Sequence, residues 1–576
     1  MSDPYPCSDF FALRTADPDQ RRAVGDAMTT SPRFRAVWSP AASWIAGLAP
    51  LGEVDDGVFR ARDNLVILQG ASALLTTEES RGEDAERLIA FGRDRPEKIA
   101  TLPGDFAWVH FAEDGSANLV RPCGGYVPLY VYEHGEVLAV STRLAYFPRF
   151  IPGDHHFDPL AVALTVTGTG ARPAGRAELR HSRCIPRGHV AHIGRRSKTQ
   201  LVRYWHPRPT SDAELSPLSA AELSRELREI LIQSFSRELP DKHPSLLWFS
   251  GGVDSSALAA VLARDIQRPF STLTITSDNR SWREHELPFI DGALAQLDIG
   301  NGRRTLFDER LLASPVLRGN STLFGLPNPA ALASLELPSD ERPRVVVSGE
   351  FADEAQGTLR RLQDWCYATS LPQALRQPRD WPLGLRTPKA WLSHQLRRAA
   401  GFPPIHLPHK LHRTMSAEVH QEYSDYRADR VRSFRDDRSP QMGLYMREQN
   451  ASWPETMWER LSEHDVRLCA PFFSREALEF AYRCPIRKLL TSTSRQLIRP
   501  VMRGRLPEKN VMRVDKGRGF GECYRGSWQP KYPQLLEGIT EQKTLFYGAD
   551  CSLGEALMLS MLDEACANLR PLPPTP

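Results

Sequence analysis

The stretch Ser250–Ser256, which reads Ser-Gly-Gly-Val-Asp-Ser-Ser, carries residue types suited to holding phosphate. It follows a short apolar run, residues 246–249, and precedes residues that favour a helix. The two glycines let the backbone turn sharply and approach a ligand, and the N–H groups at the start of a helix attract anions. Asp254 would repel a bare phosphate, so the pattern predicts a divalent cation between its carboxylate and the phosphates.

Two further stretches carry polar residues next to predicted elements. Residues 344–357 predict a strand that runs into a glycine turn and an acid pair, Asp353 and Glu354. Residues 470–520 begin with Ala-Pro-Phe-Phe and end in a glycine-rich turn around Lys516.

The three stretches together resemble one family. Ser-Gly-Gly-x-Asp-Ser resembles the pyrophosphate loop of the N-type ATP pyrophosphatases, which split ATP between its α and β phosphates. Residues 344–357 resemble the Ser-Gly-Glu-Gly-Ala-Asp-Glu element of asparagine synthetases. Residues 470–520 are similar, in order and spacing, to that family's Pro-Phe-Leu-Asp element, its Leu-Arg helix, its Leu-Pro pair and its Arg-x-x-Lys-x-x-x-Phe.

This resemblance implies ATP and Mg²⁺ as cofactors and assigns roles to individual residues. Asp254 and Asp353 would be the magnesium ligands, on separate loops. Lys516 aligns with the family's active-site lysine, which neutralises charge on the phosphates and on the tetrahedral oxyanion. Ser348 and Gly349 would contact adenosine. The complete expected ATP-binding set is Phe249, Ser250, Gly251, Gly252, Asp254, Ser255, Ser256, Ile275, Ser348 and Gly349.

The elements that must position these residues divide the chain into two halves. Short apolar or alternating runs separated by turn residues predict β structure over residues 55–205. The proline-, serine- and acid-rich residues 206–222 predict a linker, and residues 220–239, with apolar residues at helical spacing from Leu223 to Phe235, predict an amphipathic helix. Beyond residue 245 strands alternate with helices, which indicates a parallel sheet.

We therefore expect an α/β protein with two domains. Residues 1–205 would form a degenerate glutaminase-like domain, which the resemblance makes an antiparallel β-sandwich of the Ntn type. After the linker 206–222, residues 223–570 would form an asparagine-synthetase-like, amide-forming domain. The resemblance gives that domain the α/β ATP-pyrophosphatase fold (adenine nucleotide alpha hydrolase-like) with helical additions.

Composition excludes several other classes of protein. The 73 basic and 70 acidic residues leave a formal net charge of +3, too balanced for bulk binding of nucleic acid or of an acidic membrane. The nine cysteines form no Cys-x-x-Cys pair, so they predict neither a zinc site nor a disulfide framework. No stretch reaches about 18 apolar residues and no secretory signal is evident, so we expect a cytoplasmic protein.

The chain departs from asparagine synthetases where glutamine would be used. The family's glutaminase needs a cysteine directly after the initiator methionine, and this chain has Ser2 there. Relatives that use an amine already on the substrate are β-lactam synthetases, carbapenam synthetases and lasso-peptide cyclases. In the β-lactam and carbapenam synthetases a tyrosine pairs with a glutamate. The tyrosine stands at the position of Glu350 and the glutamate at the position of Arg467. Glu463 lies one helical turn earlier, so that pair is not present as such.

Lasso-peptide cyclases, or macrolactam synthetases, resemble the C-terminal segment more closely, through Ala-Pro-Phe, a Met-x-Gly run before Pro507, and Arg-x-x-Lys-Gly. That resemblance implies a precursor peptide as substrate and a leader peptidase of the same pathway as a candidate partner. The ligase would adenylate a side-chain carboxylate of the peptide and close a macrolactam with its N-terminal amine. The catalytic candidates are Lys516, with Glu350 or Glu463 as base for the amine.

Three alternatives remain open at this point. The first is a small-molecule amide synthetase of the asparagine or β-lactam synthetase type, and the second is a non-catalytic nucleotide-binding scaffold. The third, a tRNA-modifying pyrophosphatase, is disfavoured by the near-neutral charge and the lack of paired cysteines.

Overall fold

The computed structural model describes a part of the chain that includes both predicted halves. The described residues are 8–31, 34, 36–39, 44–50, 58–61, 64–70, 90, 94–102, 104–166, 175–195, 198–205, 218–239, 244–300, 302–306, 329–352, 392, 396, 399, 417–433, 452–484 and 495–514.

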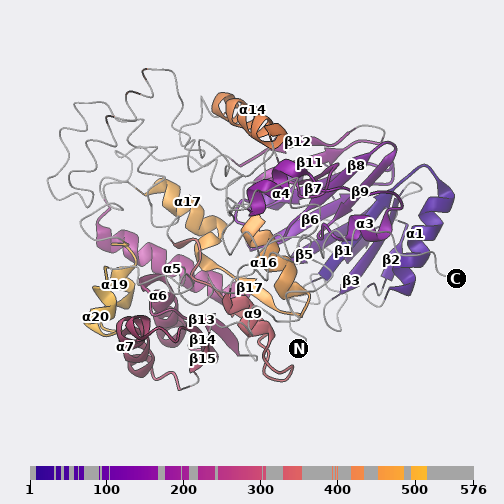
Figure 1. Cartoon of the computed structure of the whole chain (residues 1–576). Coiled ribbons are helices and arrows are strands. Elements are labelled where there is room, and N and C mark those ends of the chain that lie inside the picture. The colour runs from indigo at the N-terminus through magenta and orange to yellow at the C-terminus, as the bar shows by residue number, and fades with distance from the viewer. Residues whose placement is uncertain are drawn as a thin grey trace.

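Two antiparallel sheets form the N-terminal half (Figure 1). Within the described residues the first sheet has six strands in the order β10-β8-β9-β1-β3-β2, and the second has six in the order β12-β11-β7-β6-β5-β4. The bounds of the first set are β1 Ser8–Arg14, β2 Ala36–Trp38, β3 Trp44–Pro50, β8 Tyr130–His134, β9 Val137–Ser141 and β10 Ser182–Cys184. Those of the second are β4 Val58–Ala61, β5 Asn64–Gly70, β6 Phe106–Phe111, β7 Ala117–Arg121, β11 His189–Ile193 and β12 Gln200–Arg203.

The two sheets pack face to face as a sandwich, because alternate side chains of each strand point into one shared core. On β6, Ala107, Val109 and Phe111 enter the same buried cluster as Phe10 of β1. Trp44 of β3 meets Phe111 edge to face at 4.8 Å between ring centroids. The observed strands confirm antiparallel β structure in this half, and β1–β3 extend it toward the N-terminus of the predicted 55–205 region.

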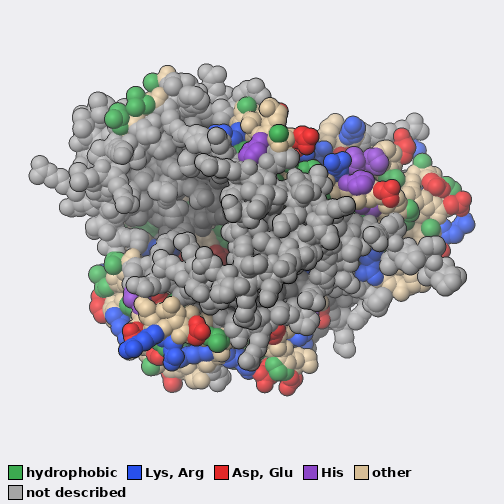
Figure 2. All heavy atoms as spheres, viewed as in Figure 1, with side chains coloured by type: hydrophobic (Ala, Val, Ile, Leu, Met, Phe, Trp, Pro, Cys, Tyr) green, Lys and Arg blue, Asp and Glu red, His purple; other side chains and the backbone are tan. Residues whose placement is uncertain are grey.

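Helices cover the outside of the sandwich. They are α1 Pro18–Thr30, the 3₁₀ segment Pro96–Thr101, α3 Tyr146–Phe150, α4 Pro159–Val166 and, from far along the chain, α14 Ala417–Ser433. Figure 2 shows histidine side chains gathered on the face of the molecule over β8. Two of the histidines in this region, His134 and His181, stack with ring centroids 4.2 Å apart.

A parallel sheet forms the C-terminal half, which confirms the prediction from alternating strands and helices. Its five strands in the described residues have the order β15-β14-β13-β16-β17. They are β13 Ser245–Trp248, β14 Phe270–Thr276, β15 Gly302–Leu306, β16 Val345–Val347 and β17 Arg467–Cys469. The helices around it are α5 Ala220–Glu238, α6 Val253–Val261 with a π-helical turn Leu262–Ile266, α7 Arg280–Leu297, α9 Pro329–Leu335, α16 Ser452–Ser462, α17 Arg475–Arg483, α19 Arg499–Met502 and α20 Glu508–Val511.

Helix α5 shows how the sequence fixes one element and where the predicted linker ends. Leu223, Leu227 and Phe235, three of its predicted apolar positions, are buried. The helix begins at Ala220, inside the expected linker 206–222, because Ser219 and Glu222 form a reciprocal capping box. Residues 206–217 of that linker lie outside the described residues.

Buried ion pairs join the sandwich to the parallel-sheet half. Glu455 of α16 is fully buried, and its Oε1 accepts from Arg121 of β7 and from Arg187, the latter at 2.7 Å. Arg143, which follows β9, binds Asp9 at 2.5 Å and donates to the Ser462 hydroxyl at 2.7 Å. Charges this deeply buried need such partners, so the two halves are locked together by specific contacts.

The described helices are too short or too polar for a bilayer. In the part of the chain that the structure describes, none combines the length and the apolar character that crossing a membrane requires.

Candidate functional site

The turn after β13 has the backbone shape that the Gly-Gly pair predicts. Gly251 has a φ of +69°, in the left-handed region that favours glycine. A Cβ at Gly251 would lie 2.8 Å from Cγ1 and 3.1 Å from the backbone N of Ile290 in α7. Gly252 is the N-cap of α6, so the turn delivers the chain directly into that helix.

Serine hydroxyls hold the turn in place. The Ser255 hydroxyl accepts from the backbone N–H of Ser250 at 3.2 Å, and the Ser250 hydroxyl accepts from the N–H of Gly252 at 3.3 Å. The first backbone bond of the helix runs from the Ser256 N–H to the Gly252 carbonyl at 2.9 Å. The N–H groups before Ser256 have no partner inside the helix and point out of its positive end, as an anion site requires.

The second predicted loop reaches the same place from the neighbouring strand. Strand β16 pairs with β13, so Ser348 and Gly349 emerge beside the turn. A Cβ at Gly349 would lie 3.3 Å from the backbone N of Ser255, which measures how closely the two loops approach. Ser348 is buried, and its hydroxyl accepts from the N–H of the exposed Glu350 at 3.2 Å.

The two side chains expected to contact adenine are buried and do not form an open surface. Phe249 is 1% exposed and Ile275 is 9% exposed. The Thr274 hydroxyl donates to the Phe249 carbonyl at 2.8 Å, which fixes β14 against the end of β13. Ser256, another expected ATP-binding residue, is fully buried, and its hydroxyl has no hydrogen-bond partner among the described residues.

Two arginines far along the chain complete the site: Arg513, which opens the predicted Arg-x-x-Lys motif, and Arg495, which was not among the predicted site residues. Arg495 donates through Nε to Oδ1 of Asp254 at 2.5 Å. Arg513 donates to the Gly251 carbonyl at 3.2 Å and binds both oxygens of Glu286, at 2.9 and 2.7 Å. Both arginines lie in the run from 470 to 520 that resembles the family, and that run was the available signal.

Arg499 holds the backbone of the segment that contains Arg513. Its guanidinium donates to the carbonyls of Val511 and Arg513, the latter at 2.6 Å, and so holds the residues that follow α20. Burial lowers the pKa of Arg499, and the positive charge of Arg495 lowers it further, while Asp254 opposes the shift. The turn therefore lies in a positive environment balanced by Asp254.

Glu463 lies at the other end of the sheet. It precedes β17, and the Arg467 N–H at the start of that strand donates to the Arg344 carbonyl just before β16, at 2.8 Å. Glu463 also acts electrostatically on Arg143 of the sandwich. Because parallel strands share one direction, a residue before β17 lies at the amino edge, away from the turn after β13. The structure thus separates Glu463 from the other candidates, whereas Glu350 stays among them.

Two expected site residues, Asp353 and Lys516, lie outside the described residues. Across the residues that the structure does describe, no group of three or more His, Cys, Asp or Glu side chains is arranged to hold a metal ion. Asp254 fits one magnesium ligand: its side chain is 21% exposed, lies on the turn, and already carries a cationic partner.

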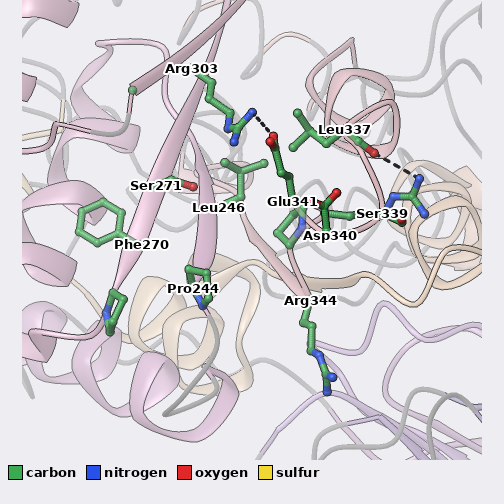
Figure 3. A pocket seen from close by; sticks show the side chains of 14 residues that line it. Pro244, Leu246, Phe270, Ser271, Arg303, Leu337, Ser339, Asp340, Glu341 and Arg344 are labelled. Atoms are coloured by element: carbon green, nitrogen blue, oxygen red, sulfur yellow. Dashed lines mark hydrogen bonds and ion pairs between the residues drawn. The ribbon is translucent and has the colours of Figure 1, made fainter.

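A cavity of about 880 Å³ lies at the amino edge of the sheet (Figure 3). Pro244, Pro269 and Arg344, each just before a strand, line it. Figure 3 shows the ion pair between Arg303 and Glu341 in this cavity, where the two side chains approach to 2.8 Å. Ligands of open α/β sheets bind beyond the carboxyl ends of the strands, so the turn and not this cavity is the candidate ATP site.

Solved structures similar to this chain are remote. An allosteric regulatory enzyme of purine biosynthesis is 12% identical, with 58% of this chain and 86% of that chain covered and a TM-score of 0.24. A glutamine phosphoribosylpyrophosphate amidotransferase from B. subtilis, complexed with ADP and GMP, is 10% identical, with 61% and 78% covered and a TM-score of 0.23. The U34-tRNA thiolase NcsA from Methanococcus maripaludis is 13% identical, with 41% and 83% covered and a TM-score of 0.20. Likenesses this weak carry no conclusion about this chain.

No curated protein matches the chain. The sequence model of the asparagine synthase family does match it, over residues 226–545, which is more than half of the 576 residues. The matched region includes the turn after β13, the loop after β16, and Arg495 and Arg513. The chain therefore belongs to the asparagine synthase family of ATP-dependent, amide-forming ligases.

Proposed function

We propose that the protein is a macrolactam synthetase, which adenylates an Asp or Glu side chain of a precursor peptide and joins it to the peptide's N-terminal amine. The observation that carries the proposal is the turn Ser250–Ser256 at the carboxyl edge of the parallel sheet, in a chain of this ligase family. The peptide substrate is supported by the resemblance of residues 470–520 to lasso-peptide cyclases.

The first step is activation of the carboxylate. A carboxylate oxygen attacks the α-phosphorus of ATP. The bond between that phosphorus and the oxygen bridging the α and β phosphates breaks, and pyrophosphate leaves. The N–H groups at the start of α6 and the hydroxyls of Ser250 and Ser255 bind the pyrophosphate oxygens. Arg495, at the same turn, adds positive charge where negative charge accumulates.

Magnesium fits the acidic side of this turn. Asp254 would hold the ion together with Asp353, which the family resemblance assigns. When bound, the ion neutralises repulsion between these carboxylates and the phosphates. The first turn of α6 fixes the backbone of Asp254 beside the proposed phosphate site, and its carboxylate is held there by Arg495.

The second step is closure of the ring. The amine nitrogen attacks the acyl carbon, the bond from that carbon to the AMP oxygen breaks, and the amine gives up a proton. Glu350 is the base we propose, because it is exposed and lies next to the adenosine loop. Lys516 would stabilise the oxyanion, as the resemblance implies. Holding amine and carbonyl together lowers the barrier, so the peptide must be bound in a folded form.

The test combines protein, ATP, Mg²⁺ and a synthetic leader-free core peptide from a short reading frame beside the gene. We expect AMP and a peptide lighter by one water in the mass spectrum, and neither with Asp254→Ala. A second arm offers ammonia with aspartate, the substrates of the small-molecule alternative. If no arm yields AMP, or if Asp254→Ala behaves like the wild type, the ligase proposal is wrong.

A further inference from the structure

The loop at the ATP site contains a residue in a conformation that its type disfavours. Phe351 has a φ of +67°, in the left-handed region. It lies in a turn closed by the Ala352 N–H, which donates to the Gly349 carbonyl at 3.4 Å. The asparagine synthetase element that this loop resembles has glycine at this position, which adopts such a φ without strain. Something else must therefore hold Phe351 in place here.

Phe473 supplies that support. Its ring stacks on the ring of Phe351 with centroids 3.9 Å apart and an angle of 26° between the planes. Phe473 is 1% exposed and ends the short 3₁₀ segment Pro471–Phe473 that follows β17. Stacking of two buried rings contributes to stability beyond the area it buries, so it can hold a strained turn.

The sandwich holds Phe473 from its own side. The Arg187 guanidinium carbon lies 4.9 Å from the Phe473 ring centroid, and the Tyr126 ring lies 6.4 Å away and nearly parallel. The Tyr126 hydroxyl donates to the Leu468 carbonyl in β17 at 2.6 Å. A Cβ at Gly124 would lie only 2.3 Å from the Phe473 carbonyl oxygen, so the sandwich backbone presses directly on this segment.

We propose that Phe473 couples the β-sandwich to the ATP site, with Arg187 as the positioning residue. Arg187 and Tyr126 fix the Phe473 ring, and that ring keeps Phe351 in the left-handed turn that sets Gly349 against α6. Contacts from the sandwich would then stabilise the loop conformation that binds the nucleotide. This inference rests on the proposed function in one respect, namely that the loop Ser348–Ala352 belongs to the ATP site.

Arg121 is a matched control for Arg187. Both arginines bind Oε1 of Glu455 and the Gly125 carbonyl, and both are almost completely buried. Nη1 of Arg121 instead donates to the Ile185 carbonyl at 2.9 Å, inside the sandwich. Replacing either arginine should therefore weaken the same ion-pair cluster, and replacing Arg187 should in addition remove the guanidinium that lies over the Phe473 ring.

The test measures the KM for ATP and hydrogen exchange of residues 345–352 in Arg187→Met and Arg121→Met. Both variants should lose similar thermal stability. Arg187→Met should raise the KM for ATP about tenfold and speed exchange in the turn, whereas Arg121→Met should change neither. Arg187→Lys should restore part of the loss, because an ammonium can also lie over the ring.

A second variant guards against simple misfolding. Phe351→Gly removes the need for the stack, so in that background Arg187→Met should no longer raise the KM for ATP. Equal KM values and equal exchange in Arg187→Met and Arg121→Met would overturn the coupling. Hydrogen exchange needs no turnover, so it tests the coupling even if the wild type forms no AMP, a result that would instead refute the proposed function.

Discussion

Arg495 and Asp254 form an ion pair across 241 positions of sequence, with Nε of the guanidinium 2.5 Å from Oδ1 of the carboxylate. The acid stands in the first turn of α6 and the arginine lies just before α19. The pair therefore ties the segment before α19 to the turn that we propose binds phosphate, where it would keep the carboxylate from repelling an incoming anion.

Replacing Arg495 should weaken ATP binding most when magnesium is absent. In Arg495→Met, the Asp254 carboxylate loses its partner and repels the phosphates, so the Kd for ATP should rise about 10- to 100-fold in EDTA. With Mg²⁺ in excess the rise should be smaller, because the ion can take over the charge of Arg495. Calorimetric titration measures both values. Arg503→Met, at an exposed position nearby, is the control, and equal affinities for Arg495→Met and wild type in EDTA would contradict this role.

Gly251 should tolerate no side chain. Gly251→Ala adds the cost of a left-handed φ, about 1–2 kcal/mol, to a clash with Ile290, and we expect a total loss of about 3 kcal/mol in the free energy of unfolding. Gly504→Ala is the matched control, because Gly504 has a φ of +72° and no heavy atom within 4 Å of its Cβ position. Urea denaturation should show the smaller loss, about 1–2 kcal/mol, for the control. Equal losses would show that the contact with Ile290 is unimportant.

Asp105 should make the protein less stable as the pH rises. Burial, and next the charge of Glu238, raise the pKa of Asp105 to about 8, although its Oδ1 accepts from the N–H groups of Tyr126 and Val127. In the unfolded chain the pKa is about 4. The folded protein therefore holds an extra proton between these two values, and stability falls as the pH rises from about 4 to about 8.

Asp105→Asn keeps the acceptor oxygen and removes the charge. Its thermal stability should fall less than that of the wild type between about pH 5 and pH 8. Some dependence should remain, since burial also raises the pKa of Glu238. Parallel melting curves across this range would refute the role of Asp105.

The two candidate bases should behave differently. Glu350→Gln should lower kcat about 100-fold or more and leave the KM for ATP unchanged, because it removes a proton acceptor and not a nucleotide contact. Glu463→Gln should leave kcat near the wild-type value, since Glu463 lies at the amino edge of the sheet, beside Arg143. Single-turnover kinetics with the core peptide separates ring closure from adenylation. A larger effect at Glu463 than at Glu350 would reverse the assignment.

Local patterns allowed part of this structure to be predicted. The Gly-Gly turn, the burial of Leu223 and Leu227 in α5, and the order of strand and helix all follow from neighbours in sequence. The predicted helix, residues 220–239, starts where α5 starts, whereas the predicted linker 206–222 overlaps its first turn, which the capping box between Ser219 and Glu222 fixes.

Contacts between distant segments could not be predicted in the same way. Spacing along the chain placed Glu463 near a catalytic position, but it does not show at which end of a strand a residue lies. The partners of Asp254 and Gly251, Arg495 and Arg513, come from more than 200 residues away. The support of Phe351 by Phe473 likewise depends on how two strands lie side by side.

The position of strand β1 has a consequence for how the chain is made. It lies between β3 and β9, so Phe11 pairs with Ser141, which is synthesised long afterwards. Asp9 on the same strand binds Arg143, which also needs Ser462, and Arg121 needs Glu455, 334 positions later. Contacts of such long range close slowly, and the buried pairs that join the sandwich to α16 cannot form before residue 462 has been synthesised.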